Sequence, residues 1–218
     1  GLLHGAALRP AYARARILSL DTAAALALPG VRAVLTAADI PGSRLIGHLK
    51  QDYPVMIGLG EITRFRGDAL ALVAAESEHI ARAAAQLIKV EYQPLPGIFS
   101  PERAAAPDAP LLHADTPGNL LARESLARGD AARAIAEAAH VARSSFILPP
   151  TEHAFLEPEC AAALPEGEGL RLISGDQGIY QTQKEVAAML GLAPESVRVQ
   201  AAAIGGGFGG KEDMSVQH

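Results

Sequence analysis

A run of glycines near the end of the chain is the segment best suited to hold a ligand. Five glycines flank one phenylalanine in Gly205-Gly206-Gly207-Phe208-Gly209-Gly210, which Lys211 and Glu212 follow. Glycine has no Cβ, so such a run takes positive φ freely and lets a ligand approach the main chain closely. Successive exposed N–H groups in a turn can hold an anion or an oxo group. The run therefore predicts a binding loop made of main chain.

Three interpretations of this loop compete when it is considered alone. Gly205, Gly207 and Gly210 satisfy the G-x-G-x-x-G pattern of dinucleotide-binding folds, although a run so rich in glycine matches it almost automatically. The loop nearly matches the P-loop pattern, but Glu212 stands where that pattern needs a hydroxyl for magnesium. A carboxylate at that position would repel a triphosphate. The third interpretation is a tight structural turn, so a nucleotide-binding module and a turn remain as alternatives.

Two upstream segments carry further polar residues. Residues 151–160 read Thr-Glu-His-Ala-Phe-Leu-Glu-Pro-Glu-Cys, and Ser174-Gly175-Asp176-Gln177 precedes an amphipathic stretch. The first segment suggests a metal site, but Pro149, Pro150 and Pro158 prevent the regular helix that would bring His153 and Glu157 together. The chain has a single cysteine, which alone cannot hold zinc or an iron–sulfur cluster. We therefore expect no metal to be bound directly by protein side chains.

The three segments together resemble the large, molybdenum-binding subunit of the xanthine dehydrogenase and aldehyde oxidase family. The glycine run with Lys211-Glu212-Asp213 is similar to the molybdopterin-binding signature of that family. Residues 151–160 resemble a family segment that usually begins Gln-Glu-His, and residues 174–177 resemble its Ser-Thr-Gln segment. Six segments nearer the start of the chain resemble the family's small hammerhead domain: Leu8-Arg9-Pro10, Tyr12-Ala13, Leu28-Pro29-Gly30-Val31, Val34-Leu35-Thr36, Gly67-Asp68 and Val90-Glu91-Tyr92. The resemblance covers nearly the whole chain, in the family's order.

The resemblance assigns roles to the matched positions. Gln177 would donate a hydrogen bond to the apical oxo ligand of molybdenum, and the main-chain N–H groups of Gly207, Phe208 and Gly209 would face the cofactor. One well-aimed donor of this kind is worth about 3 kcal/mol. Glu212 matches the carboxylate that orients the purine in xanthine-oxidising relatives, so Gln177 and Glu212 are the predicted catalytic residues. Alternatively, Gln177 is a loop residue whose carboxamide forms hydrogen bonds with the nearby main chain. Glu212 could likewise form only a weak surface ion pair with the preceding lysine.

The resemblance implies an oxidoreductase of purine metabolism, a molybdenum hydroxylase that acts on N-heterocycles such as xanthine or hypoxanthine with water as oxygen donor. Its cofactor would be molybdenum-molybdopterin, with 2Fe–2S clusters and FAD on other domains or subunits of an oligomer. An aldehyde or nicotinate hydroxylase of the same superfamily is the main alternative. A nucleotide-binding module that uses the glycine loop is the alternative of another class. The family's catalytic base lies near the C-terminal end of the subunit, so the chain alone would be inactive.

Local patterns predict the elements that position these segments. Alternating strands and helices indicate an α/β (α+β) fold. The resemblance implies a small hammerhead-type α/β domain, followed by the truncated first part of a molybdopterin-binding α+β domain. Ser77 is suited to cap one helix, and Gly191 to end another in a left-handed conformation. Strands are expected at residues 5–8, 16–20, 31–35, 69–74, 89–92, 140–147, 159–164, 170–173 and 196–204, and helices after Asp21-Thr22 and at residues 77–86, 130–139 and 180–190.

The remaining features set the boundaries of this interpretation. A proline-rich stretch at residues 94–118 reads as a linker, so domains are expected at residues 1–110 and 111–218. The net charge of −5 argues against nucleic-acid binding, and no apolar run approaches the length of a membrane span. We expect a cytoplasmic protein. The chain lacks an initiator Met and stops soon after the glycine loop, so we read it as a fragment.

Overall fold

The computed structural model describes residues 1–48, 50–149 and 151–212. The chain divides into two compact units, and the first combines Gly1–Gly97 with His153–His218. The second unit is Ile98–Glu152. The boundary expected at residue 110 falls inside the second unit and stays a prediction. The expected α/β class is confirmed, because small sheets and helices alternate along the chain.

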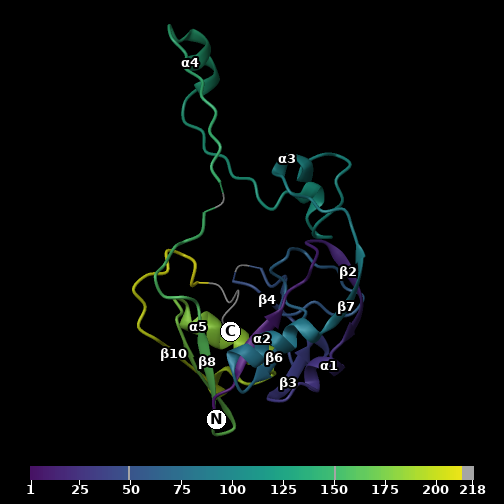
Figure 1. The fold of residues 1–218 in the computed structure, drawn as a ribbon. Coiled ribbons are helices and arrows are strands. Elements are labelled where there is room, and N and C mark those ends of the chain that lie inside the picture. Colours follow the sequence, from purple (N-terminus) through teal and green to yellow (C-terminus); the bar gives the residue numbers. More distant parts are fainter. Residues whose placement is uncertain (49, 150, 213–218) are drawn as a thin grey trace. The chain divides into compact units, whose positions relative to one another are not determined.

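A three-stranded antiparallel sheet with helices packed against it forms the first core. Its strand order is β1-β6-β3, and α2 packs on β1 and β6 (Figure 1). Alternate residues of β6 are buried, and α2 buries alanines on one face, as the periods of a strand and a helix require. Small side chains let the helix approach the sheet closely. The elements are β1 (His4–Leu8), α1 (Ala23–Leu26), β3 (Val31–Thr36), η1 (Ala37–Asp39), β6 (Ala71–Ala75) and α2 (Glu78–Leu87).

An antiparallel pair of strands lies beside this core. β2 (Ala15–Asp21) pairs with β7 (Lys89–Pro94), and the register shifts between Ile17 and Ser19. Ile17 is fully buried and packs with Ile57 and Leu70, which lie in the irregular excursion of residues 40–70 between η1 and β6. Two very short strands, β4 (Leu45–Ile46) and β5 (Tyr53–Pro54), pair within that excursion.

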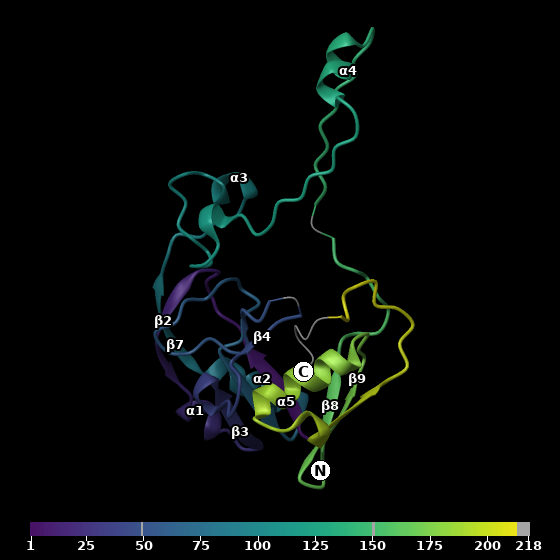
Figure 2. The same ribbon diagram turned by 180° about the vertical axis from the view of Figure 1, so that it is seen from behind.

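A β-α-β unit leads to the glycine-rich loop. β8 and β9 form an antiparallel hairpin, β10 runs parallel to β9, and α5 connects them (Figure 2). Gly191 ends α5 with φ 65, which confirms the predicted left-handed cap. The strand expected through residue 204 ends earlier, at Ala201. The elements are β8 (Ala161–Glu166), β9 (Gly169–Ser174), α5 (Ile179–Leu190), η3 (Pro194–Ser196) and β10 (Val197–Ala201).

The excursion before β4 contacts the end of α5 directly. The N–H of Gly42 donates to the carbonyl of Met189 at 2.9 Å, and the N–H of Ser43 donates to that of Ala188 at 2.8 Å. Ile46 of β4 belongs to the same buried cluster as residues of β9, α5 and β10. The N-terminal segment and the β-α-β unit therefore share one core.

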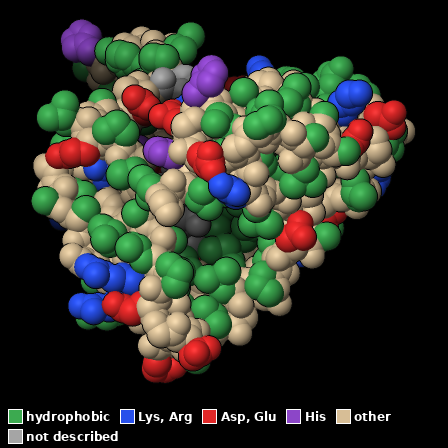
Figure 3. All heavy atoms as spheres, turned by 60° about the horizontal axis from the view of Figure 1, so that its bottom comes forward, with side chains coloured by type: hydrophobic (Ala, Val, Ile, Leu, Met, Phe, Trp, Pro, Cys, Tyr) green, Lys and Arg blue, Asp and Glu red, His purple; other side chains and the backbone are tan. Residues whose placement is uncertain are grey.

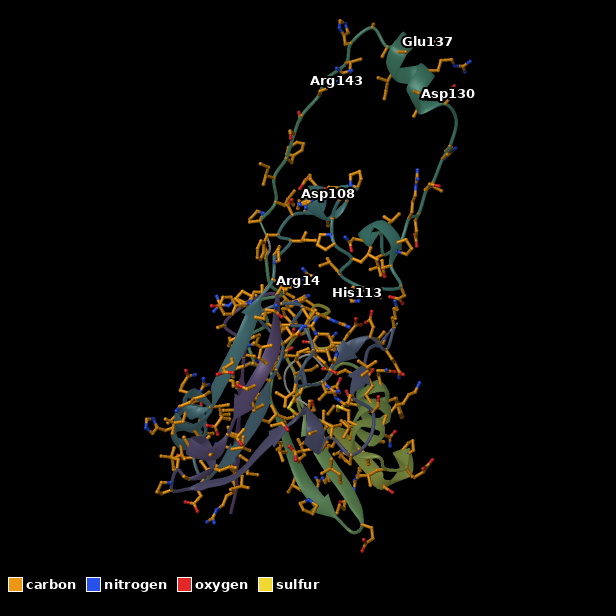
Figure 4. All side chains as sticks on the ribbon, turned by 90° about the vertical axis from the view of Figure 1, so that its right-hand side faces the viewer. Arg14, Asp108, His113, Asp130, Glu137 and Arg143 are labelled. Atoms are coloured by element: carbon orange, nitrogen blue, oxygen red, sulfur yellow. The ribbon has the colours of Figure 1, made fainter. Side chains whose placement is uncertain are left out.

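The second unit contains short elements joined by extended chain. These are α3 (Pro101–Ala104), η2 (Pro117–Asn119) and α4 (Ala131–Glu137). Asn119 has φ 55, and its carboxamide donates to the carbonyls of Ala104 and Pro110 and accepts from the N–H of Leu112. Asp130 caps α4 by accepting from the N–H of Arg133, and Asp130 and Glu137 mark the two ends of that helix (Figure 4).

The strand predicted at residues 140–147 is wrong. These residues lie outside every strand, and Phe146 and Ile147 are 81% and 96% exposed. The β-forming side chains are present, but a strand also needs a partner for its main-chain hydrogen bonds. Within the described residues of this chain, no segment pairs with this stretch.

Charged side chains of both signs are spread over the face shown in Figure 3. On the face shown in Figure 3, Lys and Arg side chains lie in small groups among Asp and Glu rather than in one basic field. Such a distribution is unlike a phosphate-binding surface. Among the helices of the described residues, none has the length and apolar character needed to cross a membrane.

Candidate functional site

The glycine-rich loop follows β10 and contains a strained turn. The N–H of Gly210 donates to the carbonyl of Gly207 at 2.8 Å, and both residues between them have positive φ, 53 at Phe208 and 90 at Gly209. A bulky residue in the left-handed region costs about 1 kcal/mol or more. The Phe208 side chain is also 72% exposed, so burial does not compensate for the strain. Backbone strain of this kind is typical of functional loops.

Close packing leaves no room for a Cβ at three of the loop's glycines unless a neighbouring side chain moves. A Cβ on Gly207 would lie 2.2 Å from Oε1 of Gln177, and one on Gly205 would lie 2.6 Å from Oε1 of Glu157. A Cβ on Gly210 would lie 2.7 Å from the ring of His153. The loop therefore runs between Gln177 and the segment at residues 153–157, in contact with both.

Gln177 and the loop are joined by two hydrogen bonds. The N–H of Gln177 donates to the carbonyl of Lys211 at 2.8 Å, and Oε1 of Gln177 accepts from the N–H of Lys211 at 3.2 Å. The carboxamide oxygen faces the loop, and the nitrogen is the end of the carboxamide that can donate to a ligand. The next residue back, Asp176, is buried and accepts from the N–H of Gly178 and the hydroxyl of Thr182, so Gln177 is held at the start of α5.

Main-chain donors in the middle of the loop face no acceptor in the part of the chain that the structure describes. The N–H groups of Gly205, Gly210 and Lys211, at the edges of the loop, donate to Glu157, Gly207 and Gln177. Within residues 1–48, 50–149 and 151–212, no protein acceptor takes the four consecutive N–H groups at residues 206–209. Consecutive main-chain donors of this kind can form an anion-binding concavity.

Lys211 is buried although it carries a charge. Its side chain is 0% exposed, its ammonium lies 3.5 Å from Oε2 of Glu157, and it sits 4.4 Å from the centre of the Phe155 ring. The other oxygen of Glu157 accepts from the N–H of Gly205 at 2.8 Å. Hydrogen bonds from the main-chain N–H groups of Glu157 and Gly205, with a smaller contribution from Lys211, lower the pKa of the Glu157 carboxyl. Burial raises the pKa of Glu159 nearby, against the opposing charges of Lys211 and His153.

The structure brings together most of the residues that the sequence singles out. Gln177, Gly207, Phe208 and Gly209 lie in one place. Glu212 is exposed, and its carbonyl lies 3.4 Å from where a Cβ on Gly178 would be, so its main chain also lies beside the start of α5. The suggested surface pair between Glu212 and the preceding lysine is wrong, because the ammonium of Lys211 turns inward to Glu157.

Sequence reasoning missed Lys211 and Glu157. It assigned Lys211 to a surface pair, and it considered Glu157 only as a metal ligand. No periodicity marks either contact, since 54 residues separate the two partners and neither lies in a helix or strand. In the described part of the chain, no three His, Cys, Asp or Glu side chains gather as a metal site.

Family models match two long stretches of the chain. Residues 1–96 match the aldehyde oxidase and xanthine dehydrogenase a/b hammerhead domain. Residues 112–218 match the molybdopterin cofactor-binding domain.

Relatives and solved structures match over nearly the full length of the chain. It is 38% identical over all its residues to a probable xanthine dehydrogenase subunit of Bacillus subtilis, covering 29% of that protein. It is 36% identical over 99% of its length to the nicotinate dehydrogenase large molybdopterin subunit of Eubacterium barkeri, covering 50% of it. The aldehyde oxidoreductase of Desulfovibrio gigas superimposes with a TM-score of 0.79 at 32% identity, over 91% of this chain and 23% of that structure.

The chain thus spans between 23% and 50% of the length of these proteins. The comparisons give no support to a nucleotide-binding module, because the matched domains and relatives are those of molybdenum enzymes. Shared segments in the same order, two matched domain models and a common fold lead to one conclusion. The chain belongs to the molybdenum-binding subunits of the xanthine dehydrogenase and aldehyde oxidase family.

Proposed function

We propose that this chain forms part of the molybdopterin site of a hydroxylase that acts on N-heterocycles such as xanthine or hypoxanthine, with water as oxygen donor. One observation carries the proposal: four consecutive main-chain N–H groups lack protein acceptors among the described residues, and the carboxamide of Gln177 lies beside one of these residues, Gly207. Such donors suit an anionic, oxygen-bearing group. The described residues offer no cluster of metal-binding side chains, which suits a metal that its cofactor binds. The cofactor, when bound, supplies the redox and oxygen-transfer chemistry.

In this proposal the residues of the site hold and orient the cofactor. Gln177 donates from its nitrogen to an oxo group, while its oxygen stays on the N–H of Lys211. Gly207, Phe208 and Gly209 offer main-chain donors whose direction the turn fixes in advance. Donors already in place cost no reorganisation when charge develops, which is the usual source of electrostatic catalysis.

A carboxylate at Glu212 favours a heterocyclic substrate. It is exposed at the edge of the loop, where an acceptor for ring N–H groups would orient a purine and stabilise charge on its nitrogens. The main alternative is an aldehyde or nicotinate hydroxylase, since relatives with these names match the chain as well. Two relatives are named as subunits, which supports a complex of several subunits. We place 2Fe–2S clusters and FAD on partner domains or subunits of that complex. We further propose an oligomeric, cytoplasmic enzyme of purine metabolism, with this chain inactive alone.

The test is made on the full-length protein isolated with its partners. We expect molybdenum and pterin in the native protein and formation of uric acid from xanthine. In Gln177→Glu, the side chain keeps an oxygen for the N–H of Lys211 but loses its donor nitrogen, so kcat should fall about 100-fold at unchanged molybdenum content. Gln86→Ala, on the exposed face of α2, is the control. A native protein that contains neither molybdenum nor pterin would refute the proposal.

The substrate class is tested with Glu212→Gln, which keeps the shape of the side chain and removes its charge. We expect kcat/KM for xanthine to fall about 100-fold, because the lost interaction acts in the transition state. Turnover of aldehydes should change little. If the native protein oxidises aldehydes or nicotinate but not xanthine, the alternative substrate class is correct and the molybdopterin site still stands.

A further inference from the structure

A lysine inside a protein needs a reason, because removing an ammonium from water is costly unless it is paired. Lys211 ends the glycine-rich loop, and its side chain is 0% exposed. A lysine that follows a glycine loop in phosphate-binding proteins reaches forward to the ligand. Here the ammonium turns toward the protein, to Oε2 of Glu157 and the face of the Phe155 ring.

Glu157 connects the two ends of the loop. Its Oε1 accepts from the N–H of Gly205 at 2.8 Å, and its Oε2 lies 3.5 Å from the ammonium of Lys211. Gly205 opens the loop and Lys211 closes it, so one carboxylate spans the segment whose inner N–H groups have no acceptor among the described residues. We call this arrangement of Glu157, Lys211 and Phe155 the loop clamp.

The loop clamp also reaches Gln177. The main chain of Lys211 both donates to and accepts from Gln177, so the position of the buried lysine sets the position of the carboxamide. The charges of Glu157 and Lys211 offset each other. The clamp therefore fixes the geometry of the loop without placing a net charge beside the proposed anionic group.

We propose that Glu157 and Lys211 are positioning residues, which hold the glycine-rich loop and Gln177 in the arrangement that receives the cofactor. The inference rests on the proposed function of the loop as a cofactor site. It differs from a direct role for Lys211, in which the ammonium itself would attract the bound group. A direct role would leave Glu157 dispensable, whereas a clamp requires both partners.

Two variants and their combination separate these roles in the full-length protein. Glu157→Gln keeps an oxygen for Gly205 but leaves a buried ammonium without its counter-charge. Lys211→Met keeps an apolar stem over Phe155 and leaves Glu157, whose side chain is 41% exposed, in contact with water. The double variant removes the buried charge altogether. Glu168→Gln and Lys184→Met, both at exposed positions, are the matched controls.

The first measurement is hydrogen exchange of the main-chain amides of Gly205, Gly210 and Lys211, which have protein acceptors, in cofactor-free protein. We expect exchange about 10-fold faster in Glu157→Gln and about 3-fold faster in Lys211→Met, because the clamp opens. The double variant should exchange no faster than Glu157→Gln, since the two residues act as one unit. The clamp would be overturned if the exchange rate in Glu157→Gln were unchanged. It would also be overturned if the increases in rate of the two single variants multiplied in the double variant.

The second measurement compares kcat with KM in the loaded enzyme. Misplacement of Gln177 and the loop should lower kcat about 10-fold at unchanged KM and equal molybdenum content, and Lys211→Arg should restore part of it. If Glu157 and Lys211 only stabilised the fold, their variants would lower the unfolding temperature and leave kcat unchanged. If Glu157→Gln does not fold, the double variant, which has no unpaired buried charge, still gives the exchange result. Absence of molybdenum from the native protein would refute the proposed function and leave the exchange result intact.

Discussion

Two of the buried charged residues, Lys211 and Asp68, differ in how their charges are compensated. Lys211 has a carboxylate and an aromatic face as partners. Asp68, which is 1% exposed, accepts from the N–H groups of Arg64 and Phe65 with Oδ2. Its Oδ1 has no hydrogen-bond partner among the described residues. Burial raises the pKa of Asp68 above 3.8, although these two N–H groups oppose the shift.

This shift makes a prediction for Asp68→Asn. A carboxyl whose folded pKa is raised contributes stability that is full below the unfolded pKa and is lost as pH rises through the folded pKa. The wild-type protein should therefore lose stability as the pH rises from about 4 towards neutrality, through the raised pKa of Asp68. Asn has no charge to desolvate, so the variant should lose less over the same range.

Urea unfolding of the full-length protein across that pH range measures the difference. Asp130→Asn is the control, because Asn replaces Asp well at an exposed helix cap. Parallel pH curves for the wild type and Asp68→Asn would contradict the prediction.

At the scale of elements, the sequence predicts best the helices whose ends carry a capping residue. Ser77 begins α2 and Gly191 ends α5, both as expected, because a cap and a left-handed glycine act within a few residues. The strand expected at residues 140–147 fails for the opposite reason. Strand pairing depends on a distant partner, which the local sequence does not reveal.

The cap at Ser77 is open to a direct test. Its hydroxyl accepts from the N–H of Ile80 at 3.3 Å, and α2 covers the first core with buried alanines. Ser77→Ala should lower the free energy of unfolding by about 1 kcal/mol, because a main-chain donor loses its acceptor. Ser77→Asp should keep most of the stability. The measurement is chemical denaturation, and equal stability of all three proteins would show that the hydroxyl contributes nothing.

At the scale of the molecule, contacts between distant segments form the site. The sequence predicts which residues gather at the loop, since the resemblance names Gln177 and the glycines together. It does not predict the contacts of residues 42–43 with α5, or the loop clamp, because both join segments far apart in the chain through positions that carry no pattern. Local sequence patterns thus predict elements and motifs, whereas contacts between side chains far apart in the chain become visible only in the structure.

The contact at Gly42 provides the test at this scale. A Cβ there would lie 2.0 Å from the carbonyl oxygen of Ala188 and 2.6 Å from the nitrogen of Gly191. These atoms belong to the main chain at the end of α5, so they cannot turn aside as a flexible side chain would. Gly42→Ala must therefore separate the excursion from α5 and break the hydrogen bonds of Gly42 and Ser43. We expect a loss of about 2 kcal/mol or more in unfolding free energy.

Gly5→Ala is the matched control for this substitution. Gly5 lies in β1 with nothing within 4 Å of an added Cβ, so the same chemical change there should be neutral or slightly stabilising. Thermal unfolding of the full-length protein gives the stability, and amide exchange at residues 188–192 reports the local separation. Because α5 carries Gln177 at its start, Gly42→Ala should also speed exchange in the glycine loop. Equal behaviour of the two variants would mean that the N-terminal segment and the β-α-β unit do not stabilise each other.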